Sequence, residues 1–584
     1  MLKHRFNWSL IFIPILAWNC APKESGSIVL SPDEQVSYNF HIRPILSDKC
    51  FVCHGPDANK REVDLRLDTE AGAYAALKDD PNQFVIKPGN LEESTVYHRI
   101  ISEDPGELMP PPESNLALSS AEIQLIKQWI EQGAKYEPHW AFVKAEKSLL
   151  PEETDWTINE IDRFTLKKMK EKGLQPNPEA KPYELIKRAS LDLTGLPPSP
   201  ELLDRFGDFS GELSYEDLLD GLLNDPGFGE KMAILWMDIS RYSDSYGYQD
   251  DNIRTQWPYR DWVIHAFNDN MSYDQFVTWQ LAGDLLPDAN KEQILATAFN
   301  RNHKYTEEGG VIDEEYRIEY VLDKTNTVSK GLLGITMECA QCHDHKYDPF
   351  SQKEYFEMFA FFNNTPEKGY QGDVTQSKPA KTPILFVDQE DLSGIMSFIN
   401  YSDTSKLSIS VMGELDEQRP TYILDRGVYD APTVEVEPST PASIMKFPED
   451  LEKNRLGLAK WMTAQENPLT ARVFVNLMWQ EIFGQGIVKT AGDFGMQGDL
   501  PTHPELLDWL AVDFMENGWD IKRLMKQILS SATYQQSAVI TDKHLNTDPE
   551  NLYLSRAPRL RLPAENIQDL VLASSGLLVR KVGG

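Results

Sequence analysis

The pentapeptide pattern Cys-x-x-Cys-His occurs twice in the chain, as Cys50-Phe51-Val52-Cys53-His54 and as Cys339-Ala340-Gln341-Cys342-His343. The two motifs use four of the five cysteines, so no pair is left for a separate structural disulfide. Two intervening residues place both sulfurs along one edge of a porphyrin, and the next residue, a histidine, projects towards the ring centre. The spacing therefore predicts covalent haem c, with His54 and His343 as proximal iron ligands.

A Cys-x-x-Cys pair can also be a redox-active dithiol or half of a zinc site. Neither use requires the adjacent histidine, so at Cys50 and Cys53 we favour haem. At the second motif an alternative stays open. It is a disulfide or metal site built from Cys339, Cys342 and His343, with or without His345.

The N-terminus has the pattern of an export signal. A basic segment at residues 3–5 precedes an apolar stretch at residues 6–18, which is too short for a good transmembrane span. Cys20 then follows as in a bacterial lipobox, although Asn19 is larger than the residue usual before that cysteine. We expect a signal peptide over residues 1–20, lipidation of Cys20, and export to the periplasm or outer envelope.

Charge and length limit the partners. The 584 residues, enough for about three or four domains, include 91 acidic and 57 basic side chains, a net charge of −34. This argues against nucleic acid and anionic membrane surfaces, which attract basic patches. No internal stretch has the roughly 18 apolar residues of a membrane span. Any membrane attachment is therefore expected through the lipid anchor only.

Residues 33–142 have the pattern of a small cytochrome c domain. Asp33 to Leu46 predicts a helix leading into the first motif. Ser119 and Glu122 have the spacing of a capping box, and Gly133 has the position of a C-cap. Between them lies one apolar stripe, formed by Ile123, Ile126, Trp129 and Ile130. Two helices with such stripes can bury them over a haem edge.

The sixth iron ligand should lie between these helices. Met109 is our candidate, because the run Met109-Pro110-Pro111-Pro112 has the rigid, extended backbone that can present a thioether outside a helix. His/Met ligation raises the potential and favours electron transfer. His98 is the rival ligand.

Several segments resemble the planctomycete-type cytochrome c domain: Arg43–Leu46, Leu65–Asp68, Lys87–Asn90, Met109–Pro111 and the helix with Trp129. That family commonly continues into two further domains of unknown function. Other segments resemble these two domains: Leu191–Pro198 and Cys339–Pro349 the first of them, and Arg472–Asn476, Asp493–Gly495 and His503–Leu510 the second. The resemblance implies haem in the N-terminal domain and implies little about the reaction.

Residues 155–370 predict a larger helical domain that ends in the second motif. Helical spacing occurs at Ile158–Met169, Tyr183–Leu191, Tyr215–Leu223, Gly229–Tyr242, Tyr273–Leu281, Lys291–Phe299 and Asp313–Gly334. No Met-Pro loop follows this motif. The distal ligand of a second haem could be Met337, His303, Met358 or His345, or the position could be open.

The same region is rich in polar side chains. They are Arg241, Asp244, Tyr246, Tyr248, Tyr259, Arg260, Asp261, Arg301, Asn302, His303, Glu307, Glu308, Gly309, Gly310, Glu314, Glu315 and Arg317. A carboxylate-lined site for substrate or calcium is one interpretation. The one we favour is a solvated loop and helix N-terminus. Similarly, Trp257-Pro258-Tyr259 and Trp262 could form a sugar-stacking surface but are more often core.

Residues 371–450 predict a small β-containing connector, with a strand at Ile384–Val387 and alternation at Leu407, Ile409 and Val411. Residues 451–584 predict a C-terminal helical domain. There Thr502 and Glu505 have capping-box spacing, His503 is interpreted as part of the helix start, and a buried stripe contains Leu506, Leu507, Leu510, Phe514 and Trp519. The last residues do not look like a domain end, so we expect this domain to be incomplete. The predicted fold class is mainly α.

Three functional hypotheses follow. The first is a lipid-anchored, dihaem electron-transfer protein of the cell envelope that exchanges electrons with a redox partner protein or a quinone-linked chain. The second is a dihaem redox enzyme, peroxidase- or oxidase-like, with a catalytic second haem. The third is a surface protein that associates with polysaccharide and has a single redox domain. No catalytic residue can be named from the sequence.

Overall fold

The computed structural model describes residues 34–57, 60–77, 80–207, 209, 213–371, 378–403 and 405–583. Within them the chain is mainly α-helical with two small two-stranded sheets, as predicted. The predicted signal peptide and Cys20 lie outside the described residues. No described helix is long and apolar enough to cross a membrane. Internal contacts divide the described residues into two compact units: a smaller one within residues 34–49 and 70–136, and a larger one within residues 50–69 and 137–583.

The smaller unit contains short helices. The helix predicted from Asp33 begins only at Tyr38, because Ser37 caps it by accepting a hydrogen bond from the Phe40 amide. The elements are η1 (Tyr38–Ile42, a π-helical turn), α1 (Arg43–Lys49), α3 (Glu70–Ala73), α4 (Thr95–Ile100), η2 (Pro112–Ser114) and α5 (Ser120–Glu131).

Helix α5 confirms the sequence prediction. The Ser119 hydroxyl accepts from the Glu122 amide, and the Glu122 carboxylate accepts from the Ser119 amide, which is a complete capping box. The apolar face, including Ile126 and Trp129, is buried, and Trp129 stacks on Tyr38 with ring centroids 5.6 Å apart. Gly133 follows the helix end with a φ of +100°, a conformation that favours glycine.

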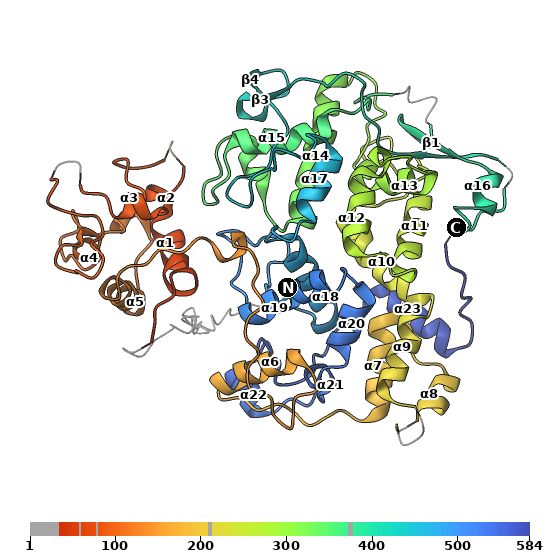
Figure 1. Ribbon diagram of the computed structural model, residues 1–584, viewed down its shortest axis with the longest axis horizontal. Helices are drawn as coiled ribbons and strands as arrows, with labels where there is room; N and C mark the ends of the chain where they lie inside the picture. The colour runs from red at the N-terminus through yellow and green to blue at the C-terminus, as the bar shows by residue number, and fades with distance from the viewer. Residues whose placement is uncertain are drawn as a thin grey trace, which may run out of the picture. The chain divides into compact units, whose positions relative to one another are not determined.

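Helices are the main secondary structure of the larger unit, and those predicted between residues 158 and 334 are all present with ends within three residues of the prediction. Its α-helices are α2 (Phe51–His54), α6 (Glu160–Glu171), α7 (Pro182–Thr194), α8 (Pro200–Phe206), α9 (Tyr215–Leu223), α10 (Gly227–Ile239), α11 (Trp257–Asn268), α12 (Tyr273–Ala282), α13 (Lys291–Ala296), α14 (Asp313–Leu332), α15 (Gln352–Asn363), α16 (Gln389–Ser393), α17 (Arg455–Met462), α18 (Thr470–Phe483), α19 (Pro504–Glu516), α20 (Ile521–Leu529), α21 (Ala532–Gln535), α22 (Asp542–Thr547) and α23 (Ala564–Ser574). Figure 1 shows α10 beside α11 and α18 beside α19, pairs that are in contact.

Both sheets are antiparallel two-stranded pairs in the predicted connector. Strand β1 (Ile384–Val387) pairs with β2 (Leu407–Ser410), which confirms the two predicted strands. Leu407 and Ile409 face the core, in agreement with the alternation in the sequence. A second pair, β3 (Thr421–Leu424) with β4 (Pro432–Val436), was not predicted.

One hydrophobic core runs through the larger unit, from Ala141 to Leu554. It joins side chains that are far apart in sequence: Tyr273 of α12 stacks on Phe474 of α18 with ring centroids 3.8 Å apart, and the Trp519 ring lies 6.1 Å from that of Tyr273. The region of the second motif and the C-terminal helices are therefore packed as one body.

A fully buried carboxylate, Asp162, links the beginning and the end of this body. In α6 it accepts from the amides of Ile158 and Asn159, at 2.9 and 3.1 Å. It also accepts from the amides of Ala532 and Thr533, at 2.9 and 2.8 Å, and from the Thr533 hydroxyl at 2.7 Å. These donors satisfy the carboxylate, which would otherwise be costly to bury.

The capping box predicted at Thr502 and Glu505 is wrong. The N-cap of α19 is His503, as the sequence suggested, but Pro504 occupies the first helical position and no side chain caps the helix. The Thr502 hydroxyl lies 2.9 Å from His503 Nδ1 instead, and Glu505 forms an ion pair with Lys167. The predicted buried stripe of α19 is confirmed.

His503 gives the fold a testable pH dependence. Burial, with a contribution from Lys168, lowers the pKa of His503 to about 3 from an ordinary 6.5. Between about pH 3 and pH 6.5, His503 is protonated in the unfolded chain but not in the folded protein. The free energy of unfolding therefore falls as pH falls, by about 1.4 kcal/mol per pH unit. We expect a flatter pH dependence of unfolding in His503→Gln than in the wild type. Equal slopes in His503→Gln and the wild type would contradict the assignment.

Candidate functional site

The first motif lies in the short helix α2 of the larger unit. The amides of Cys53 and His54 donate to the Cys50 carbonyl, at 3.1 and 2.8 Å, so a single turn positions the three side chains. Both cysteines are half-buried. His54 Nδ1 is buried without a hydrogen-bond partner, and burial lowers the pKa of His54, which favours the neutral imidazole that binds iron. Two cysteines one helical turn apart, followed by a neutral histidine, fit haem c.

The segment after the motif folds back on it. The amides of Glu62 and Leu67 donate to the carbonyls of Cys53 and His54, at 2.8 Å each. The Arg61 guanidinium donates to the carbonyls of Gly55 and Pro56. The motif is therefore held in a closed loop of backbone hydrogen bonds.

Met109 belongs to the smaller unit. It lies in the loop between α4 and η2, where its amide donates to the Arg99 carbonyl at 3.0 Å. Of the methionines among the described residues, Met109 is the one whose side chain is exposed, whereas core methionines such as Met169 are fully buried. The rival His98 is already hydrogen-bonded, through Nε2 to the Glu92 carbonyl at 3.0 Å. The pairing of His54 and Met109 on one iron stays a prediction.

The second motif is exposed on the larger unit. Cys339 lies in the 3₁₀ turn Met337–Gln341, and both Cys339 and Cys342 are exposed free thiols. His343 is also exposed, and its Nδ1 lies 2.7 Å from the Asp344 carbonyl. That carbonyl can accept only if Nδ1 carries the proton, which leaves the lone pair on Nε2. Two open thiols and an imidazole in this tautomer also fit haem c.

The four possible distal ligands of the second motif are all buried. Met337 and Met358 are packed in the hydrophobic core. His303 has both ring nitrogens engaged, Nδ1 at 2.7 Å from the Lys304 carbonyl and Nε2 at 2.8 Å from Glu367. His345 Nδ1 accepts from the Asp348 amide at 2.7 Å. Unlike His343, these four side chains are not exposed to solvent. In the described residues, moreover, no three His, Cys, Asp or Glu side chains are grouped to hold a metal ion.

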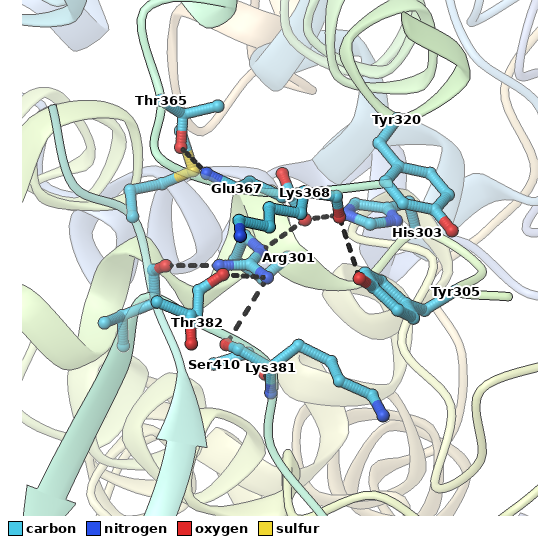
Figure 2. Close-up of polar contacts among 12 residues, drawn as sticks. Arg301, His303, Tyr305, Tyr320, Thr365, Glu367, Lys368, Lys381, Thr382 and Ser410 are labelled. Atoms are coloured by element: carbon cyan, nitrogen blue, oxygen red, sulfur yellow. Dashed lines mark hydrogen bonds and ion pairs between the residues drawn. The ribbon is translucent and has the colours of Figure 1, made fainter. Parts of the chain in front are cut away.

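A buried ion network lies between α14 and the connector, and we define it by Arg301, His303, Lys324, Glu367 and the pair Glu307–Lys381. Figure 2 shows Glu367 between Arg301 and His303, each 2.8 Å from its carboxylate. Lys324 binds the other carboxylate oxygen. All six side chains are at least 97% buried. Burial alone would raise the pKa of Glu367, but Arg301 and Lys324 outweigh it and hold that pKa well below its usual range.

The solvated-loop interpretation is therefore wrong for Arg301, His303 and Glu307. Other members of the polar set lie elsewhere: Arg241 forms an ion pair with Asp323, Arg260 with Asp261, and Arg317 with Glu314. Arg254, which the sequence did not single out, donates to four backbone carbonyls around the network. A sugar-stacking surface at residues 257–262 is also wrong for Tyr259 and Trp262, which are fully buried.

Sequence reasoning missed Glu367, Lys324 and Lys381. One signal was present for Lys324, which lies three residues after Val321 and four before Val328, both fully buried. A lysine on the apolar stripe of a helix must find an acid inside the protein. Glu367 and Lys381 carry no such local signal.

Three family models match the chain in order: Planctomycete cytochrome C at residues 50–113, a protein of unknown function (DUF1549) at residues 160–367, and a protein of unknown function (DUF1553) at residues 454–584. The chain thus contains a c-type cytochrome domain, which implies haem c. Its architecture is the one that the motifs indicated, a planctomycete cytochrome C domain followed by two domains of unknown function. No curated protein and no solved structure matches the chain.

Proposed function

We propose that this c-type cytochrome transfers electrons at the cell envelope and carries haem c at both motifs. The observation that carries the second haem is the presentation of Cys339, Cys342 and His343. Both thiols are free and exposed, and the Asp344 carbonyl fixes the histidine tautomer that leaves Nε2 able to bind iron.

Each residue then has a defined task. When bound, haem c supplies reversible one-electron transfer. Cys50 and Cys53 would hold the first porphyrin, His54 would bind its iron, and Met109 would complete the ligation. Cys339 and Cys342 would hold the second porphyrin, with His343 as its proximal ligand. The electrons would pass to or from a redox partner protein or a quinone-linked chain, and the export signal with Cys20 supports a lipid-anchored location.

A second candidate function is a dihaem redox enzyme. It is favoured by the burial of Met337, His303, Met358 and His345, which leaves the second iron without a distal ligand among the residues that the sequence suggested. Such an iron could take an external ligand. A high-spin spectrum from one of two haems would favour this function over electron transfer alone.

Counting covalent haems tests the proposal. The protein is produced with cytochrome c maturation factors, and haem is counted by the pyridine haemochrome spectrum and by intact mass. We expect two haems in the wild type, one in Cys339→Ser/Cys342→Ser, and one in Cys50→Ser/Cys53→Ser. A wild-type count of one that is unchanged by Cys339→Ser/Cys342→Ser would overturn the second haem. A colourless wild type would overturn the whole proposal.

A further inference from the structure

The second motif is held by the first residue of helix α15, Gln352. Its side-chain Nε2 donates to the Gln341 carbonyl at 3.0 Å and to the Leu424 carbonyl at 3.1 Å. Gln341 directly precedes Cys342, and Leu424 ends strand β3. One amide group therefore uses both of its hydrogens to join the motif to the connector.

The backbone of Gln352 holds the other end of the motif. Its amide donates to Oδ1 of the Asp344 carboxylate at 2.9 Å. Asp344 is also the residue whose carbonyl lies 2.7 Å from His343 Nδ1 and fixes the tautomer of that imidazole. Because the carboxylate and the carbonyl belong to one residue, anchoring the carboxylate restricts where the carbonyl can lie.

The turn after β3 also contacts the motif. Gly427 has a φ of +72°, and a Cβ there would lie 3.0 Å from Gln341 Nε2 and 3.3 Å from Cys342 Sγ. Glycine therefore lets this turn approach the motif without displacing either side chain. The backbone of the motif is thus fixed by α15 and by this turn, while Cys342 stays exposed. Such support from neighbouring residues is what keeps a ligand set in its working geometry.

The hydrogen bond at His343 Nδ1 bears on the metal-binding nitrogen of the same ring. An imidazole that donates through Nδ1 to a fixed carbonyl binds a metal more strongly through Nε2, and such partners tune the metal. At the first motif the loop is held differently, by backbone amides of the segment that follows it and by Arg61. At the second motif the support comes from α15, which follows Asp344 by only a few residues.

We propose that Gln352 is the positioning residue of the second haem site and acts on His343 through Asp344. This inference rests on the haem c proposed above for the second motif. Gln352 holds the Gln341 carbonyl and the Asp344 carboxylate, so that His343 keeps its proton on Nδ1 and offers Nε2 to iron. A stronger imidazole donor stabilises ferric iron, so the arrangement lowers the potential of the second haem.

Reduction potentials test the contact through Asp344. They are measured by potentiometric titration of full-length Cys50→Ser/Cys53→Ser protein, in which the second haem is the one expected to remain. Asp344→Ala removes the anchored carboxylate and should raise the potential. Asp344→Asn removes the charge but keeps an oxygen that accepts from the Gln352 amide, so its rise should be smaller. Equal rises in the two variants, or none in either, would overturn the proposal.

The tautomer of His343 gives a readout that needs no haem. Nitrogen NMR shifts of labelled histidine report it in the full-length chain made without maturation factors, at about pH 8, where an ordinary histidine is neutral. His343→Gln assigns the signal, and circular dichroism verifies the helices. We expect mainly Nδ1–H in the wild type and in Asp344→Asn. Asp344→Ala and Gln352→Met should shift the ratio towards Nε2–H by about fivefold, the effect of one typical hydrogen bond.

Gln389→Met is the matched control. Gln389 is also the first residue of a helix, α16, and its Nε2 also donates to a backbone carbonyl, that of Asp403 at 2.7 Å. Its potential and tautomer ratio should equal those of the wild type. A wild-type His343 protonated on Nε2, or the same ratio in Gln352→Met and Gln389→Met, would overturn the inference. If the tautomer results hold but the wild type carries one haem, Gln352 still fixes the tautomer, and the proposed second haem is what fails.

Discussion

Met109→Ala protein is expected to lose the near-infrared band of a methionine–iron bond while keeping its covalent haem. The thioether is the feature that gives His/Met haems their high potential. The potential of the first haem should therefore fall by a sizeable part of the roughly 0.8 V over which axial ligands set haem potentials. Because Met109 is exposed and lies in a loop hydrogen-bonded to Arg99, the substitution should leave the fold intact.

The control for this prediction is His98→Gln, which removes the rival ligand. Near-infrared absorption and potentiometric titration of both variants separate the two candidates. If the wild type lacks the band, or if His98→Gln shifts the potential and Met109→Ala does not, our assignment of the sixth ligand is wrong. The same result would leave the haem attachment at Cys50 and Cys53 untouched.

Glu367→Gln is expected to lower the free energy of unfolding of the larger unit by about 3–5 kcal/mol at neutral pH, the usual effect of removing one partner from a buried ion pair. The substitution keeps the shape of the side chain but leaves Arg301 and Lys324 buried without their counter-charge. Denaturant unfolding monitored by circular dichroism measures the loss.

The acid dependence of this loss follows from the pKa of Glu367. Because that pKa is held well below its ordinary 4.5, the carboxylate stabilises the fold above about pH 4.5, and its contribution is lost as pH falls further. The difference between wild type and Glu367→Gln should therefore shrink below pH 4.5. Glu437→Gln, at an exposed pair with Lys453, should change stability much less than Glu367→Gln, because solvent screens exposed pairs. Similar losses in the two variants would show that the buried ion network does not stabilise the fold.

Local patterns were enough to predict the helices, because capping residues and apolar periodicity act within a few residues. The capping box at Ser119 and the strand at Ile384–Val387 are confirmed for this reason. The same rule failed at Thr502. The helix there begins at Pro504, and the Thr502 hydroxyl contacts the neighbouring His503 ring instead of capping the helix. Spacing alone does not report such a competing contact.

The candidate sites show the same difference between local patterns and long-range contacts. Each Cys-x-x-Cys-His motif is contiguous in the sequence, so spacing alone is enough to find its residues. The buried ion network joins Arg301 to Glu367 and Glu307 to Lys381 across 66 and 74 residues, and its members look like surface charges when taken one at a time. Only the folded chain shows that they neutralise one another.

The contact between Asp162 and Thr533 spans 371 residues. During synthesis, the inward carboxylate of the first helix of the DUF1549 region has only its two local amide donors until the ribosome has passed Thr533 in the DUF1553 region. The two regions should therefore complete folding together, after residue 533 has emerged, rather than one after the other. A chain cut between them would be expected to yield fragments that complement each other on mixing, and neither half alone should reach the native state.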